Sequence, residues 1–317
     1  MATIKEIADK LGIASSTVSK GLNGASDISD ELRQQVLSTA AALGYTTKKM
    51  KSRDNRRVCI FIENMRYTTQ GDFGLDVILG FKQAAFHSNW MVEVKNMTPE
   101  LQKKERYDTY MLKNEFGGSF LLGFSAQDEW IRQLPDTSVS TVLLDNYIPI
   151  NPNVCCISTD AEAGIVAAVE HLTKLGHQKI VFLNDTTGSM VSRLRNRTFF
   201  DSMHAHGLDV LRTDDYFDVG VTAFICANAT IAANIQNQCN RLHLSVPDDI
   251  SLICFDDSID GATPDPQLTL IQQHRTNLGK CAHHSMCSLL DQIPVSKMLV
   301  HPQLMQRSST GIVMPRG

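Results

Sequence analysis

The 317-residue sequence lacks the patterns of several broad protein classes. No apolar run reaches the roughly 18 residues that a membrane-spanning helix needs. No apolar signal core follows the N-terminus, which already carries an acid at Glu6. We therefore expect a cytoplasmic protein that makes no membrane contact. Cysteine occurs eight times but never as Cys-x-x-Cys, which excludes the usual spacing of zinc and thiol-redox sites.

Motifs of the common enzyme classes are missing as well. The chain contains no G-x-G-x-x-G, no phosphate loop and no G-x-S-x-G. His283 and His284 are neighbours, but no further histidine or carboxylate stands at metal-ligand spacing. His177 lies in a turn before a strand, where a structural role is favoured over catalysis. We expect no enzymatic activity, no cofactor and no bound metal.

Charge is distributed unevenly along the chain. The net charge is −4, which by itself argues against a nucleic-acid partner. Residues 1–57, however, hold ten Lys and Arg against six Asp and Glu, whereas the remainder holds 20 against 28. A basic N-terminal segment joined to an acidic body is the charge layout of a DNA-binding domain attached to a domain of another kind.

The first 45 residues read as three short helices. Thr3 and Glu6 have the spacing of a capping box, and the apolar residues that follow recur at helical intervals up to Gly12. A second helix begins at Ser15 and stops at Asn23-Gly24, and a third runs from about Ser29 to Gly44. Two helices joined by a tight turn and supported by a third predict a helix-turn-helix.

The second of these helices predicts how the head reads DNA. Ser15, Ser16 and Lys20 are its outward-facing residues. Small hydroxyl side chains allow close approach to the major groove, and a lysine can donate to guanine or to a phosphate. Periodicity alone also permits an ordinary three-helix surface that has no partner.

The amino-acid sequence of this segment resembles that of the DNA-binding head of the lactose-repressor (LacI/GalR) family of bacterial regulators. The matching runs are Thr3-Ile4-Lys5-Glu6-Ile7-Ala8, Thr17-Val18-Ser19-Lys20, Leu22-Asn23 and Leu43-Gly44-Tyr45. The resemblance places Ser15, Ser16 and Lys20 at base-reading positions and implies DNA contacts from Thr3, Thr17, Ser19, Asn23 and Tyr45. Ala14 departs from the family, which usually has a capping serine there.

A polar, basic linker covers residues 46–57. In the family this stretch forms a hinge helix on DNA and inserts a leucine into the minor groove. Here the linker is shorter, has no leucine, and offers Met50 as its only apolar candidate. We expect DNA contacts dominated by charge, with the solvated tether as the alternative. The predicted contact residues are Lys48, Lys49, Met50, Lys51 and Arg53.

From residue 58 onward, short apolar runs alternate with amphipathic helical segments. Strands are predicted at 58–62, 91–94, 119–122, 141–144, 180–183, 223–227 and 250–255, and helices at 73–88, 101–114, 163–175, 197–206 and 230–242. Such alternation is typical of an α/β fold with parallel sheets covered by helices. Ligands in these folds bind beyond the carboxyl ends of the strands.

The resemblance extends over this body. Asp160-Ala161-Glu162-Ala163-Gly164, the run from His171 to His177, the run from Val246 to Asp257, and Arg307-Ser308-Ser309-Thr310 match family signatures. The resemblance implies a core of two lobes, like periplasmic sugar-binding proteins, with an effector in the cleft. It assigns effector contacts to Asp145, Arg195, Asn228, Asp256 and Gln273, with Phe73 as an apolar wall.

These candidate residues combine hydrogen-bond acceptors, an arginine fork and two amides, which suits the hydroxyl groups of a sugar. Ala229 stands where the family usually has an aspartate, and the 217–223 segment is too short for the helix that relatives place there. A non-sugar effector or a degenerate pocket therefore remains an alternative. A sugar-binding transport protein and a sugar-active enzyme are the rival classes.

We accordingly predict three parts. Residues 1–45 form the DNA-binding head, 46–57 the hinge, and 58–317 a two-lobed core for effector binding and dimerisation. The expected protein is a homodimeric transcription regulator of the repressor type that binds a palindromic operator in double-stranded DNA. A carbohydrate effector shifts its population between two states.

Overall fold

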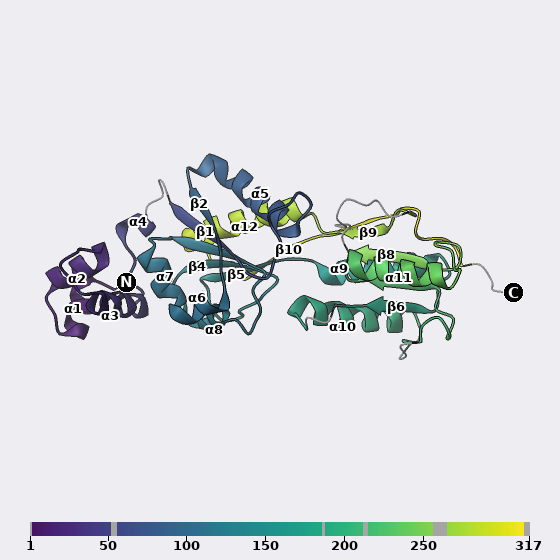
Figure 1. Ribbon diagram of the computed structural model, residues 1–317, viewed down its shortest axis with the longest axis horizontal. Coiled ribbons are helices and arrows are strands. Elements are labelled where there is room, and N and C mark those ends of the chain that lie inside the picture. Colours follow the sequence, from purple (N-terminus) through teal and green to yellow (C-terminus); the bar gives the residue numbers. More distant parts are fainter. Residues whose placement is uncertain (1, 52–55, 186–187, 212–214, 256–264, 314–317) are drawn as a thin grey trace. The chain divides into compact units, whose positions relative to one another are not determined.

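The computed structural model describes residues 2–51, 56–185, 188–211, 215–255 and 265–313. The chain divides into two compact units (Figure 1). The amino-terminal unit comprises residues 1–68, 74–157 and 276–298 and contains both the head and one lobe, here called the amino-terminal lobe. The carboxy-terminal unit comprises residues 69–73, 158–275 and 299–317. The chain therefore passes between the units after residues 157, 275 and 298, besides the short excursion at 69–73.

The head has the three predicted helices. They are α1 (Ile4–Leu11), α2 (Ser15–Asn23) and α3 (Asp30–Ala42). The capping box is present: the hydroxyl of Thr3 accepts from the backbone N–H of Glu6, and the Glu6 carboxylate accepts from the backbone N–H of Thr3. Gly12 ends α1 with a left-handed φ of +66°, which a glycine adopts without steric cost. The linker contributes one short helix, α4 (Lys48–Lys51).

The amino-terminal lobe is built on a six-stranded sheet in the order β10-β5-β4-β3-β1-β2. The strands are β1 (Arg57–Ile62), β2 (Met91–Asn96), β3 (Gly118–Leu122), β4 (Ser140–Leu144), β5 (Val154–Thr159) and β10 (Lys297–Val300). Pairing is parallel from β2 through β5. The carboxyl ends of these strands therefore lie at one edge of the sheet.

Helices cover both faces of this sheet. Phe81 of α5 (Phe73–Ala85) stacks on Phe120 of β3, and the sulfur of Met286 from α12 (Arg275–Leu290) lies against Gly118, so both helices share one face. The other face carries α6 (Pro99–Lys104), α7 (Tyr107–Lys113) and α8 (Glu129–Gln133), followed by the short 3-10 helix η2 (Leu134–Asp136). A 3-10 turn, η1 (Phe86–Ser88), extends α5.

The carboxy-terminal unit has a five-stranded sheet in the order β11-β9-β8-β7-β6. Its strands are β6 (Ile180–Leu183), β7 (Ala223–Cys226), β8 (Ser251–Phe255), β9 (Thr269–Gln272) and β11 (Gln303–Met305). All neighbours are parallel except β9 and β11. One face packs on α9 (Ala161–Lys174) and α10 (Met190–Ala205), and the other on α11 (Ala229–Arg241).

The structure corrects several predicted elements. The helix predicted over 101–114 is two helices, α6 and α7. The break lies at Glu105, whose carbonyl accepts from the Trp130 indole at 2.9 Å, while the N–H of Tyr107 donates to the side chain of Gln133 at 3.0 Å. Both backbone groups are thereby taken from a continuous helix. The helix predicted from residue 197 starts at Met190 instead, because Ser189 caps it. β5, β9, β10, β11, α8 and α12 were not predicted.

Three observations bear on the sequence analysis of the chain. Among the described residues, no helix is long and apolar enough to cross a bilayer. All eight cysteines carry free thiols; Cys281 and Cys287 are partly exposed and the others are buried. His177 has the structural role predicted for it: its ring lies within 3.1 Å of Thr222, Ser251 and the Gly311 carbonyl.

Candidate functional site

The outer face of α2 carries the predicted DNA-reading residues together. Ser15, Ser16, Lys20 and Asn23 are exposed, and Thr17 and Ser19 are half-buried. The opposite side of the helix is fixed in the head, since Val18 is fully buried. A methyl group at Gly21 would lie 3.1 Å from Val36 of α3, so the glycine allows α2 to pack closely there. The reading face is thus a small polar surface on a rigid support.

Two contacts organise this face. The ammonium of Lys20 forms an ion pair with Asp27, and both side chains are more than half exposed. Such an exposed pair contributes little to stability, so Lys20 can exchange this partner for a phosphate or a base. Asn23 donates to the Ser19 hydroxyl at 3.4 Å, which ties two of the polar side chains on this face together.

The first turn of α2 presents backbone donors. The N-cap residue is Ala14, and its side chain supplies no capping hydrogen bond. Helix N-termini with open N–H groups favour anions such as phosphate. Thr3 is not comparably open, because its hydroxyl is already engaged with Glu6. Tyr45 is half-buried against the apolar core of the head.

The predicted hinge residues divide into two groups. Lys48 and Lys51 are exposed on α4. Lys49, in contrast, forms an ion pair with Glu115 of the amino-terminal lobe at 2.9 Å, and Met50 is buried in the apolar cluster of the head. Arg53 lies outside the described residues. Lys49 is nevertheless 75% exposed, so the three lysines of α4 all face solvent and Met50 is the buried member of the predicted run.

Arg195 is the most enclosed of the predicted effector residues. It lies in α10, rather than ahead of that helix as the sequence predicted, and its side chain is only 7% exposed. The guanidinium carbon lies 3.9 Å from the centre of the Phe255 ring, and Nη1 donates to the Ala227 carbonyl at 3.4 Å. Phe255 and Ala227 stand at the carboxyl ends of β8 and β7, so Arg195 lies at the end of the sheet where folds of this kind bind ligands.

Two amides lie at strand ends of the same unit. Asn228 follows β7 and caps α11, where its Oδ1 accepts from the N–H of Ile231 at 3.0 Å. Its exposed Nδ2 group is a donor suited to a hydroxyl. Gln273 follows β9 and is half-buried. Asp256 lies outside the described residues.

The remaining predicted residues are Asp145 and Phe73. Asp145 follows β4 in the amino-terminal unit, has a left-handed φ of +60°, and donates its N–H to the Ile157 carbonyl. Phe73 belongs to the stretch 69–73 that is grouped with the carboxy-terminal unit. The guanidinium of Arg275 lies 5.4 Å from the Phe73 ring centre and donates to the Gly71 carbonyl at 2.8 Å.

Sequence reasoning missed Phe255 and Arg275. Phe255 ends an apolar strand immediately before two aspartates, and this position at the carboxyl end of a strand could have marked it as a neighbour of the predicted effector residues. Arg275 lies two residues after Gln273. Its partner Phe73 is about 200 residues away in the sequence, so no local pattern could have predicted that this arginine lies over the Phe73 ring.

Comparison with known proteins agrees with this architecture. Residues 3–48 match the family described as bacterial regulatory proteins, lacI family. Residues 169–310 match the periplasmic binding protein-like domain. The two matches cover the head and most of the carboxy-terminal unit.

Curated relatives align along nearly the whole chain. The probable HTH-type transcriptional repressor ExuR of Bacillus subtilis is 24% identical over 334 residues, which cover 98% of each chain. The HTH-type transcriptional repressor CytR of Escherichia coli is 24% identical over 318 residues, covering 92% of this chain and 90% of the relative. Both relatives bear the names of HTH-type transcriptional repressors.

Solved structures show the same fold. The lac repressor dimer bound to operator and the anti-inducer ONPF aligns with a TM-score of 0.66 at 22% identity, covering 98% of this chain and 99% of that one. The transcriptional regulator CelR in complex with cellobiose aligns with a TM-score of 0.67 at 17% identity, covering 98% and 100%. The head thus matches the lacI family of bacterial regulatory proteins, the core matches the periplasmic binding protein-like domain, and the chain is similar along nearly its whole length to transcriptional repressors.

Proposed function

We propose that this protein represses transcription by binding operator DNA through α2. The observation that carries the proposal is the exposed polar face of α2, formed by Ser15, Ser16, Lys20 and Asn23 on a buried, capped framework. Serine hydroxyls and a lysine match base edges and phosphates in the major groove. A homodimer that presents two such helices reads a palindromic operator.

The open N-terminus of α2 and the exposed lysines of α4 supply the phosphate contacts of this proposal. The side chain of Ala14 supplies no cap to the first turn of α2, and Lys48 and Lys51 add positive charge beside the head. These contacts are independent of sequence and make the affinity depend on salt. The acidic body of the chain keeps non-specific DNA binding confined to the head.

We further propose that a sugar or sugar derivative controls this activity. The support is chemical: Arg195, Asn228 and Gln273 place an arginine fork and two amides at strand ends of the carboxy-terminal unit. Such side chains suit vicinal hydroxyl groups. The complex of the related regulator CelR with cellobiose supports the same ligand class.

DNA binding is tested with the purified full-length protein and random duplex DNA. Rounds of selection should enrich a palindromic site, and the wild-type protein should bind it more tightly than scrambled DNA of equal length. Failure to enrich any sequence at several salt concentrations would refute operator recognition. The selected duplex then serves as the operator in the experiments described below.

The effector is tested by thermal shift with a panel of monosaccharides, disaccharides and sugar acids. A sugar that binds the folded protein raises the melting temperature in proportion to ligand concentration over Kd. That sugar should also change operator affinity by about 5- to 150-fold, the usual range of coupling between two sites. Turnover of the added sugar would contradict a regulatory role and favour an enzyme.

A further inference from the structure

The single apolar residue of the hinge is used inside the protein. Met50 is 6% exposed and belongs to one apolar cluster with the helices of the head. The same cluster includes Leu112 of α7, which is 4% exposed and comes from the amino-terminal lobe. Two apolar side chains from outside the three-helix bundle therefore extend the core of the head. The head, the hinge and the lobe therefore contribute side chains to one apolar cluster.

One ion pair and one close approach of the backbone lie beside this apolar cluster. Lys49 is paired with Glu115, just beyond α7, at 2.9 Å. The hinge backbone runs against the lobe at Gly117, where an added methyl group would lie 2.7 Å from the Met50 carbonyl oxygen. A larger residue at this position would force the hinge away, so the close approach depends on the glycine.

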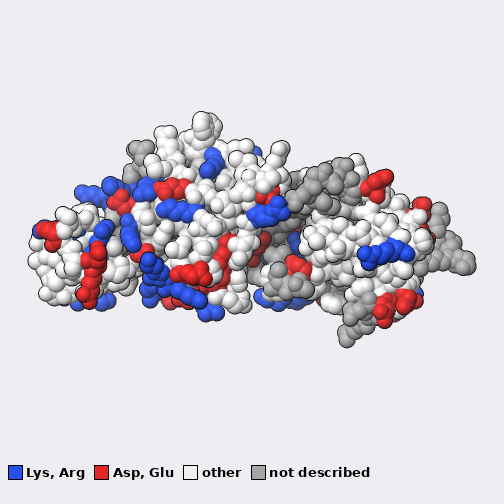
Figure 2. All heavy atoms as spheres, in the orientation of Figure 1, with Lys and Arg blue, Asp and Glu red and all other residues white. Residues whose placement is uncertain are grey.

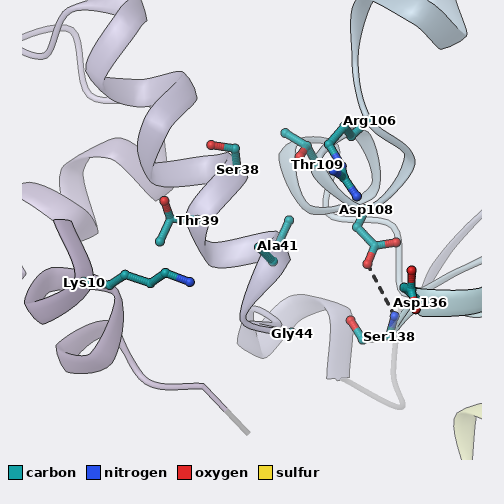
Figure 3. Close-up of a pocket in the computed structure, with 11 residues that line it drawn as sticks. Lys10, Ser38, Thr39, Ala41, Gly44, Arg106, Asp108, Thr109, Asp136 and Ser138 are labelled. Atoms are coloured by element: carbon teal, nitrogen blue, oxygen red, sulfur yellow. Dashed lines mark hydrogen bonds between the residues drawn. The ribbon is translucent and has the colours of Figure 1, made fainter. Parts of the chain in front are cut away.

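A second part of the junction is open. Between α3 and the lobe lies a cavity of about 470 Å³ (Figure 3). The head lines it from α3 and the end of α1, and the lobe lines it from α7 and residues 136–138. The polar lining residues are Lys10, Ser38, Thr39, Arg106, Asp108, Thr109, Asp136 and Ser138. A polar cavity contributes no apolar packing, so the apolar cluster that contains Met50 and Leu112 holds the junction.

The docked side of the head is not its reading side. The contacts with the lobe come from α3, Gly44 and the hinge, whereas the outer face of α2 takes part in none of those described above. On the face drawn in Figure 2, Lys and Arg atoms gather along the amino-terminal unit, interspersed with Asp and Glu. Docking the head therefore leaves Ser15, Ser16 and Lys20 exposed for DNA.

We propose that the head remains docked on the amino-terminal lobe while it reads DNA, with Met50 and Leu112 as the anchor. The inference rests on the proposed DNA-binding function and specifies how that function is regulated. A docked head follows every movement of its lobe, so an effector-driven movement of the lobe changes the spacing of the two recognition helices. Met50 then acts as an internal anchor rather than as a minor-groove wedge.

An engineered disulfide tests whether the docked state binds DNA. The Cβ position built on Gly44 lies 3.6 Å from Cβ of Ser138, within the 3.5–4.5 Å range of disulfides. We expect the full-length Gly44→Cys/Ser138→Cys protein to form this bond under mild oxidation. We also expect the oxidised form to bind the selected operator within about threefold of the same protein after reduction.

The controls for this test are the two single-cysteine variants, treated identically. They account for strain at residue 44, whose φ is +67°, and for oxidation of native thiols. Failure of the bond to form would overturn the docked arrangement, and a loss of operator binding that reduction reverses would identify docking as an inhibited state. If the wild-type protein selects no operator at all, the proposed function fails instead.

A second variant undocks the head without touching DNA-contacting residues. Leu112→Asp places a charge in the apolar anchor, and Leu101→Asp is the matched control on α6, where the leucine is 45% exposed. A freed head must be oriented again on binding, so Leu112→Asp should weaken operator affinity by about fivefold or more. Binding to scrambled DNA and the sugar-induced thermal shift should stay unchanged. Unaltered or tighter operator binding by a folded Leu112→Asp protein would overturn the proposal.

Discussion

The guanidinium carbon of Arg195 lies over a buried aromatic ring, 3.9 Å from the centre of Phe255. Burial on one side and the ring on the other hold the charged fork in one orientation, and its cation–π attraction to the ring is strongest where water is excluded. An arginine held in this way is pre-organised to donate two parallel hydrogen bonds to a ligand. This relationship supports the first prediction.

Arg195→Lys should abolish most of the sugar response while the protein stays folded. A lysine keeps the charge but lacks the planar fork and the stacking geometry, so we expect sugar affinity to fall by about tenfold or more, equivalent to about 1.4 kcal/mol. The measurement is the sugar-induced thermal shift as a function of concentration. Arg197→Lys is the control on the same helix, because Arg197 is 81% exposed and pairs with Asp201. Equal shifts in the two variants would remove Arg195 from the site.

Lys20→Ala should weaken operator binding by about 1–3 kcal/mol if the lysine reads a base. The loss should be confined to the selected operator, whereas equal losses on scrambled DNA would make Lys20 a phosphate contact. Asp27→Ala tests the role of the ion pair separately, because it removes the partner of Lys20 and leaves the lysine in place. We expect Asp27→Ala to bind operator at least as tightly as wild type. Lys174→Ala, an exposed lysine of the carboxy-terminal unit, is the control.

Local signals in the sequence predicted the head closely. The Thr3–Glu6 capping box, the stop at Gly12 and the polar face of α2 depend on residues within a few positions of one another. Most strands of the body were predicted for the same reason: their apolar runs are short and bounded by turn residues. Helix caps, helix ends and short strands depend on residues that are close together in the sequence, so they can be predicted from the sequence alone.

Interactions between distant segments were not predictable in the same way. The split between α6 and α7 depends on Trp130, 25 residues away, whose indole takes the Glu105 carbonyl. Arg195 appeared to precede a helix because no periodic apolar pattern marks the first turns of α10. The burial of Met50 required Leu112, about 60 residues later, and nothing in a basic linker signals such a partner.

His177 links three segments of the carboxy-terminal unit. Its Nε2 lies 3.1 Å from the Gly311 carbonyl, to which it donates, and Nδ1 lies 2.9 Å from the Thr222 hydroxyl. His177→Ala would leave buried polar groups without partners and should destabilise the fold by about 1–3 kcal/mol. Chemical denaturation of the two proteins at pH 7.5 measures the difference. His204→Ala, an exposed histidine on α10, should change stability by less than about 0.5 kcal/mol.

The same histidine contributes to the acid sensitivity of the protein. Burial lowers the pKa of His177, and burial lowers the pKa of His283 to about 4. Both rings are therefore neutral in the folded protein at pH values where the unfolded chain takes up protons. Stability should fall as pH drops below about 6.5, by up to about 1.4 kcal/mol per pH unit for each ring. Wild type and His177→Ala compared between pH 7.5 and 5 should show a shallower fall for the variant, whereas parallel curves would contradict this assignment.

Glu63, directly after β1, should make the protein less stable as the pH rises, which is opposite to the effect of the two histidines. It is 2% exposed, receives a hydrogen bond from Gln102, and its Oε1 atom is buried without a hydrogen-bond partner among the described residues. Burial, followed by the nearby negative charge of Asp128, raises the pKa of this carboxyl to about 7 from its ordinary 4.5. The folded protein therefore holds a proton that the unfolded chain releases above about pH 4.5. The stability that this proton contributes is full below that pH and is lost as pH rises through about 7.

Glu63→Gln tests this assignment, because glutamine keeps the size of the side chain and cannot ionise. We expect the variant to be more stable than wild type at pH 8, with a difference that shrinks toward pH 4.5, by up to about 1.4 kcal/mol for each unit of pKa shift. Denaturation curves at pH 4.5, 6 and 8 supply the measurement. Glu31→Gln, an exposed carboxylate in the first turn of α3, is the control and should leave the pH profile nearly unchanged. A constant difference between Glu63→Gln and wild type across the three pH values would show that Glu63 does not titrate in this range.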